Sequence, residues 1–128
     1  MLNRSGVAKS TFAATKQILA NVDLQSSVGC IVPQTLGVAV GSKKIAKAGT
    51  PIKVDLMNIN AVAVKADGTT PLNAVLLHDV DVTNGNANGT ALIFGFVNVN
   101  RVDSDVATAI TAAVGATARS TLITFMKV

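Results

Sequence analysis

Three neighbouring side chains of this sequence have the residue types for chemistry: His78, Asp79 and Asp81. Alternate residues of a strand share one face, so the two carboxylates could meet as in a metal site or an acid–base pair. A calcium loop beginning at Asp79 would need Asp or Asn at position 83 and a bidentate Glu at position 90, but threonine stands at both. We therefore expect both aspartates to accept hydrogen bonds near a strand end rather than to bind a metal.

Cys30 and His78 are the only cysteine and the only histidine, so a Cys–His dyad is a formal alternative. No nucleophile motif surrounds Cys30, and its neighbours Val28, Gly29 and Ile31 are typical of a buried strand. A lone cysteine forms no intrachain disulfide, which suits a reducing cytoplasm. We expect no catalytic residue, no cofactor and no metal, and we read the protein as not an enzyme.

The elements that would position these residues are mainly strands. Residues 74–82 and 91–99 are rich in Val, Leu, Ile and Phe, and Asn84-Gly85 and Asn88-Gly89 between them tolerate the positive φ angles of a reversal. The pattern predicts a long hairpin at the centre of the domain, with the Phe94-Gly95-Phe96 pair of aromatics in the core.

Other strands and one helix flank this hairpin. Strands are predicted at residues 28–32, 36–40, 44–46, 52–57, 61–65 and 121–128. Val106, Ile110 and Val114 recur at helical spacing and predict a helix over residues 105–114, with Asp103 or Ser104 as its cap. These signals predict a mainly β (α+β) fold, a compact β-sandwich or barrel-like domain.

The N-terminal residues differ in character from the rest. Residues 1–24 are small and polar and predict an extended or partly helical arm, while residues 25–128 form a single β-rich domain. The first residues lack the continuous apolar core of a secretory signal, so we expect nothing to direct export.

The composition is unusually apolar for a domain of this size. Hydrophobic residues make up 49% of the 128 residues and charged residues only 14%, against about 25% in ordinary domains. We expect exposed apolar surface and hence self-association, with no membrane partner. The formal net charge is +4, but the one tight basic group, Lys43, Lys44 and Lys47, has no aromatic residues around it, so we expect no direct nucleic-acid binding.

The amino-acid sequence of the predicted hairpin resembles that of a known protein family. The segments VLLHDVDVT and ALIFGFVNVNRV, with the AGTP element at residues 48–51 upstream, resemble tailed-phage head decoration and head fibre proteins, a family similar to the lambda-type capsid-stabilising protein. The resemblance implies a structural accessory protein that binds the outside of a phage capsid as an oligomer, a homotrimer, and stabilises the shell. Its partner would be the major capsid protein, and its location the capsid surface of the virion after synthesis in the host cytoplasm.

Contact with the capsid is expected from the arm, since its basic and polar side chains suit an acidic shell surface. The residues expected to make this contact are Asn3, Arg4, Lys9, Phe12 and Lys16. Two alternatives stay open: a head-fibre base or receptor-binding β-module, and a small trimeric enzyme with His78, Asp79 and Asp81 at a subunit interface.

Overall fold

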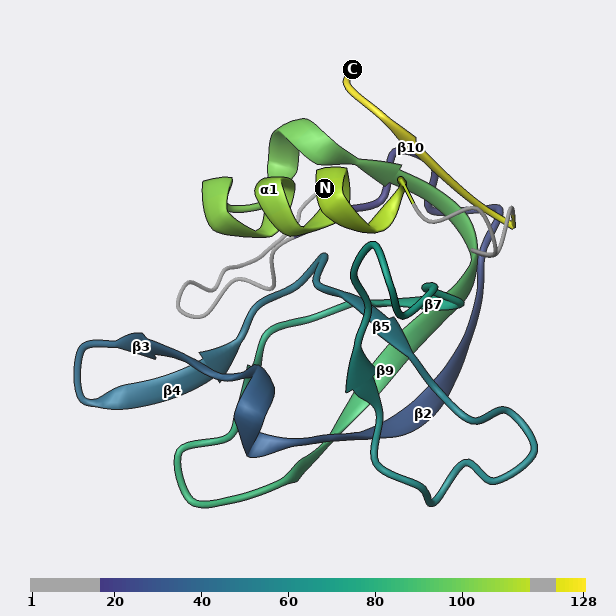
Figure 1. Cartoon of the computed structure of the whole chain (residues 1–128). Coiled ribbons are helices and arrows are strands. Elements are labelled where there is room, and N and C mark those ends of the chain that lie inside the picture. The colour runs from purple at the N-terminus through teal and green to yellow at the C-terminus, as the bar shows by residue number, and fades with distance from the viewer. Residues whose placement is uncertain (1–16, 116–121) are drawn as a thin grey trace, which may run out of the picture.

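Strands dominate the regular structure of residues 17–115 and 122–128, the part of the chain that the computed structural model describes (Figure 1). The mainly β (α+β) fold class is confirmed. The strands are β2 (Ser26–Val32), β3 (Val38–Val40), β4 (Lys43–Ala46), β5 (Pro51–Lys53), β6 (Val64–Lys65), β7 (Ala74–Leu76), β8 (Val80–Asp81), β9 (Ala87–Asn98) and β10 (Ile123–Met126). The helix is α1 (Ser104–Ala113), and two short 3-10 turns are η1 (Gln34–Leu36) and η2 (Val99–Arg101).

Strand β9 holds the larger sheet together. Its residues 87–94 pair antiparallel with β2, and its residues Ala91 and Leu92 also pair with β7. The sheet continues from β7 to β5 and β6, while β10 pairs parallel with residues 95–98 of β9. Parallel neighbours need a crossover connection, and α1 lies within the crossover from β9 to β10.

The larger sheet curls without closing into a barrel. An isolated parallel bridge joins Ile31 of β2 to Val62, just before β6, and the Ala63 N–H donates to the Ile31 carbonyl at 3.0 Å. A smaller sheet of β3, β4 and β8 stands beside it, with Gly41 at a φ of 63° in the β3–β4 turn. The two sheets are the arrangement expected of a β-sandwich-like domain.

Two apolar clusters form the core. One gathers side chains from β2, β5, β7 and the smaller sheet, among them Val32, Ile52 and Leu76, all fully buried. The other lies under α1 and joins Leu92 and Val97 of β9 to Ile123 of β10. Helix α1 contributes through its apolar stripe, in which Val106, Ile110 and Ala113 are buried.

The predicted hairpin is confirmed only in part. β7 and β9 do pair antiparallel, but the strand predicted over residues 74–82 divides into β7 and β8, and β8 pairs with β4 instead. Gly85 lies in the reversal with a φ of 139°. The turn predicted at Asn88-Gly89 is wrong, since both residues lie within β9. A Cβ at Gly89 would stand 2.7 Å from a Val32 methyl carbon, so glycine is needed there for close packing.

Three other strands are shorter in the structure than the sequence predicts. The segment 36–40 is the end of η1 followed by β3, the segment 52–57 leaves the sheet after Lys53, and the segment 61–65 makes an isolated bridge at Val62 and is a strand only from Val64. β2, β4 and α1 match their predictions to within two residues, whereas the strand predicted over residues 121–128 is found only as β10, and residue 121 lies outside the described residues. Asp103 occupies the N-cap of α1 but makes no side-chain capping hydrogen bond.

The described part of the predicted arm begins inside the domain. Ile18 and Leu19 are buried in the second cluster, and Leu19 bridges to Val97 of β9. The Asn98 N–H donates to the Ile18 carbonyl at 2.8 Å, and the Ala20 N–H donates to the Phe96 carbonyl at 2.9 Å. Residues 18–20 therefore belong to the sheet region, and the chain reaches residue 17 beside the end of β9.

Candidate protein-binding surfaces

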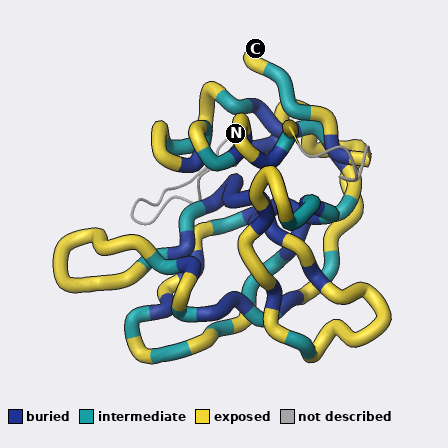
Figure 2. The backbone as a smooth tube through the Cα atoms, viewed as in Figure 1, coloured by how far each residue is buried: buried dark blue, intermediate teal, exposed yellow. Residues whose placement is uncertain are grey.

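The loop between β5 and β6 presents the most apolar exposed segment of the described chain. We call its exposed apolar side chains, together with that of the first residue of β6, the β5–β6 loop surface: Leu56, Met57, Ile59, Val62 and Val64. Met57 is 95% exposed and the others are 40% to 51% exposed. Figure 2 shows the loop as a protruding exposed stretch of the backbone. Single exposed apolar residues are ordinary, but five in nine residues make this segment a candidate interaction surface.

Hydrogen bonds at both its base and its tip define the conformation of this loop. At the tip, the Asp55 carboxylate accepts the Met57 N–H at 3.0 Å, and the Asp55 carbonyl accepts the Asn58 N–H at 3.1 Å. At the base, the Asn73 amide accepts the Val54 N–H at 2.9 Å and donates to the Val54 carbonyl at 2.8 Å. The apolar side chains are thus displayed on a shaped loop, which lowers the entropy cost of binding.

A shallow hollow of about 650 Å³ lies along the same loop. Its lining is largely apolar and includes one basic and one acidic residue; the lining residues are Lys53, Val54, Asp55, Leu56, Ala61, Val62, Val64 and Asn73. A positive and a negative side chain in one hollow allow two copies of the chain to pair opposite charges around an apolar contact.

A second apolar surface forms where three segments meet near the middle of β9. Phe94 pairs opposite Ser26, and the Gly95 N–H donates to the Leu122 carbonyl at 3.2 Å. Val22, Leu24, Phe94 and Leu122 are each 40% to 58% exposed. The prediction that Phe94 lies in the core is therefore wrong, and Phe96 is only half-buried. Leu92, two residues earlier, is fully buried.

The three clustered lysines separate into two environments. Lys43 and Lys44 are exposed beside the β3–β4 turn. The Lys47 ammonium lies 3.2 Å from an Asp103 carboxylate oxygen and 3.3 Å from an Asp105 carboxylate oxygen. Hydrogen bonds to Asp103 and Asp105 raise the pKa of Lys47. Lys47 therefore ties the segment before β5 to the start of α1.

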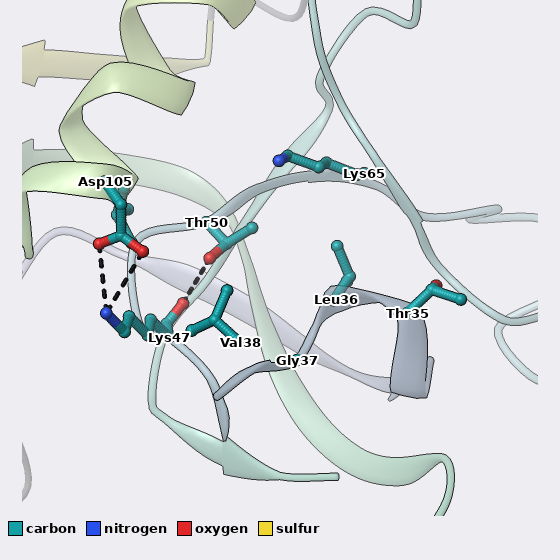
Figure 3. A pocket seen from close by; sticks show the side chains of 9 residues that line it. Thr35, Leu36, Gly37, Val38, Lys47, Thr50, Lys65 and Asp105 are labelled. Atoms are coloured by element: carbon teal, nitrogen blue, oxygen red, sulfur yellow. Dashed lines mark hydrogen bonds and ion pairs between the residues drawn. The ribbon is translucent and has the colours of Figure 1, made fainter. Parts of the chain in front are cut away.

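A small hollow of about 100 Å³ lies beside this ion pair (Figure 3). Lys65 points toward it from β6, and Thr50 donates its hydroxyl to the Lys47 carbonyl at 2.6 Å. Small-molecule sites usually measure about 300–1,000 Å³. The hollow has the size for water, and two of its three charged groups, Lys47 and Asp105, are paired with each other.

The two aspartates near His78 accept hydrogen bonds from different segments of the chain. Asp79 accepts the Ala48 N–H at 2.7 Å, while Asp81 accepts the Thr83 N–H at 2.9 Å. Hydrogen bonds from the Thr83 side chain and backbone lower the pKa of Asp81. The predicted role of both as hydrogen-bond acceptors is confirmed. Nδ1 of His78 is buried without a hydrogen-bond partner in the described part of the chain.

Cys30 lies in β2 opposite Gly89 and is buried. Burial raises the pKa of the Cys30 thiol, because the charged thiolate loses its hydration. A raised pKa disfavours the thiolate that nucleophilic catalysis needs. Within residues 17–115 and 122–128, no group of three His, Cys, Asp or Glu side chains is arranged to hold a metal ion.

The residues predicted to contact a capsid, Asn3, Arg4, Lys9, Phe12 and Lys16, lie outside the described residues. The β5–β6 loop surface was not predicted. Four of its five apolar residues were assigned to strands 52–57 and 61–65, although Asn58 and Asn60, on either side of Ile59, are the available sign of a loop.

In comparisons with known proteins, no family model matches this chain, and no curated protein matches it at a significant level. Among the described residues, no helix has the length and apolar character needed to cross a bilayer. The exposed apolar surfaces are therefore the features from which a function is best inferred.

Proposed function

We propose that this protein is a structural accessory protein that binds the outside of a phage or phage-like capsid as an oligomer and stabilises the shell. The observation that carries the proposal is the β5–β6 loop surface, an apolar, hydrogen-bonded loop at the rim of the sheet. We assign self-association of the subunits to this surface and contact with the major capsid protein to the N-terminal arm.

The resemblance to head decoration proteins supports the proposal because its separate sequence elements meet in space. The Gly49 N–H of the AGTP element donates to the Leu76 carbonyl at 2.7 Å, and the Leu76 N–H donates to the Thr50 carbonyl at 3.0 Å. The Ala48 N–H reaches the Asp79 carboxylate. The elements that carry the resemblance thus form one hydrogen-bonded unit, as parts of a shared architecture would.

The position of residue 17 also fits the proposal. The described chain begins at the end of β9, where Asn98 and Phe96 hold residues 18 and 20. Residues 1–16 precede this anchored point, and a polar segment that binds a partner can add main-chain hydrogen bonds to an exposed strand edge of that partner. An oligomer with several such arms would bind a repetitive shell through many weak contacts.

Self-association is tested by placing a charge in the loop surface. Met57→Asp should reduce the mass measured by light scattering toward the 13.0 kDa of one chain, because an oligomer would bury the new carboxylate. Ser42→Asp, at the exposed β3–β4 turn, is the matched control and should keep the oligomer. Both variants should fold, since neither side chain is buried. An unchanged mass for Met57→Asp would contradict the assignment of the surface.

Shell binding is tested separately by mixing the protein with empty shells of the same phage's major capsid protein. The parent protein should sediment with the shells and raise their melting temperature. If the parent protein neither sediments with them nor protects them, the proposed function is wrong, whatever its oligomeric state.

A further inference from the structure

The described chain contains three places where Asn or Asp precedes glycine: Asp67-Gly68, Asn84-Gly85 and Asn88-Gly89. Glycine lacks the Cβ that would shield its backbone nitrogen, so this nitrogen can attack the side-chain carbonyl carbon of the preceding residue. The attack needs a backbone free to bring the two atoms together. The three sites differ in that freedom, and the structure therefore ranks them.

Asn84 lies in the most open of the three settings. It is exposed in the reversal between β8 and β9, and no atom lies within 4 Å of the position of a Cβ at Gly85. The Gly85 N–H donates to the Val82 carbonyl at 3.3 Å, a long hydrogen bond. Little therefore opposes a rotation that would carry the Gly85 nitrogen toward the Asn84 side chain.

Asn88 has the same following residue but lies inside β9. It pairs with Ile31, and Gly89 pairs with Cys30, so the backbone is held extended on the β2 side. Gly89 is also packed against Val32 and Val80, since a Cβ there would approach their methyl carbons to 2.7 Å and 3.1 Å. Ring closure at Asn88 would require β9 to leave β2, which costs free energy.

At the third site, hydrogen bonds hold the Asp67 carboxylate in place. Its Oδ1 accepts the N–H groups of Thr69 and Thr70, both at 2.7 Å. These hydrogen bonds would have to break before the carboxyl carbon could rotate toward the Gly68 nitrogen, and they lower the pKa of Asp67. An ionised carboxylate is also a poor electrophile, so this site is protected.

We propose that Asn84 is a site of spontaneous deamidation in the folded protein and that Asn88 is not. The Gly85 amide gives its proton to a solvent base, and its nitrogen forms a bond to Cγ of Asn84. The Cγ–Nδ2 bond breaks, and Nδ2 takes a proton and leaves as ammonia. Water then opens the resulting succinimide at one of its two carbonyls, giving aspartate or isoaspartate at position 84.

Deamidation of Asn84 would change a turn to which Gln34 is hydrogen-bonded. The new carboxylate lowers the formal net charge by one, and isoaspartate adds a carbon atom to the backbone path. Asn86 accepts the Gln34 N–H at 2.9 Å, and the Thr83 carbonyl accepts the Gln34 side-chain amide at 3.1 Å. Both contacts flank Asn84, so the modification would loosen the attachment of η1 to this turn.

The test is to incubate the purified full chain in mildly alkaline buffer and to locate the mass gain of about one dalton by peptide fragmentation. In the folded protein, conversion at Asn84 should exceed that at Asn88 by about tenfold or more, because β9 must open for the second. In denaturant the two rates should approach each other. Asn84→Ser should remove the fast product from the folded chain while leaving conversion at Asn88 unchanged.

Equal conversion of both residues in the folded chain would overturn the proposal. So would a folded chain that resists conversion at both positions while the denatured chain converts at both, since the turn would then protect Asn84 as well as the strand protects Asn88. This inference does not depend on capsid binding, and neither result bears on the proposed function.

Discussion

Truncating Leu92 should destabilise the domain far more than truncating its near neighbour Phe94. Leu92 is fully buried in the cluster under α1, between its β-partners Val75 and Ser27. Leu92→Ala removes three carbon atoms, worth about 2.4 kcal/mol of transfer free energy at about 0.8 kcal/mol each. The cavity left in a packed core adds to this, so we expect a loss of about 3–4 kcal/mol.

Phe94→Ala is the matched comparison, because the sequence placed both residues in the core. Phe94 is 40% exposed on the second apolar surface, so its truncation opens no enclosed cavity. We expect a loss of roughly 1 kcal/mol, well below the cost for a buried phenylalanine.

Urea denaturation at one fixed protein concentration measures both losses, since dissociation of an oligomer would also contribute to stability. The midpoint of Leu92→Ala should fall well below that of Phe94→Ala at a similar slope. Equal losses, or a larger loss for Phe94→Ala, would refute the division of β9 into a buried and an exposed part.

Three further outcomes are expected. Deletion of residues 1–16 should leave the melting temperature close to that of the parent while abolishing sedimentation with empty shells; retained binding would place the contact on the β-rich body. Asp81→Asn should reduce the loss of stability on acidification, because the lowered pKa of Asp81 gives stability that is present above the usual value of 3.8 and lost as the pH falls through the folded value. Lys47→Met should speed hydrogen exchange in the first turn of α1. In the parent this contact should weaken as the pH rises past the usual lysine value of 10.5, because the raised pKa of Lys47 stabilises the folded state only while the amine is charged.

Local signals in the sequence were sufficient for several elements. β2 ends where Pro33 follows Val32, and α1 follows from apolar residues three and four apart. In both cases the deciding information lies within a few residues of the element, as in a proline stop or a helical stripe.

Long-range pairing decided the elements that the sequence did not predict. The apolar run 74–82 reads as one strand, yet Val80 pairs with Ala46 in the smaller sheet while Leu76 pairs with Ala91 in the larger one. Asn88-Gly89 has the composition of a turn, but Gly89 is there because the Val32 side chain packs against it. Neither partner is near in sequence, so no local pattern could identify it.

The candidate surface was missed for a related reason. Leu56 continues the alternation of apolar and charged residues that begins at Ile52, and such alternation predicts a strand whether or not the chain still has a pairing partner there. Pairing with β7 stops at Ile52 and pairing with β6 stops at Lys53, and Leu56 and Met57 are left on the outside. In contrast, the hydrogen-bonding roles of Asp79 and Asp81 could be predicted, because short acidic side chains next to strand ends commonly accept backbone N–H groups.

The anchoring of residue 19 and of β10 on the same residue of β9 has a mechanical consequence. Leu19 bridges to Val97, and Phe125 pairs with Val97 in the parallel β9–β10 ladder. A pulling force between the N-terminal segment and the C-terminal strand would pass directly across this part of β9. Strands β5 and β6 and the loop between them lie outside that path, so the force would be carried at Val97 without passing through the β5–β6 loop surface.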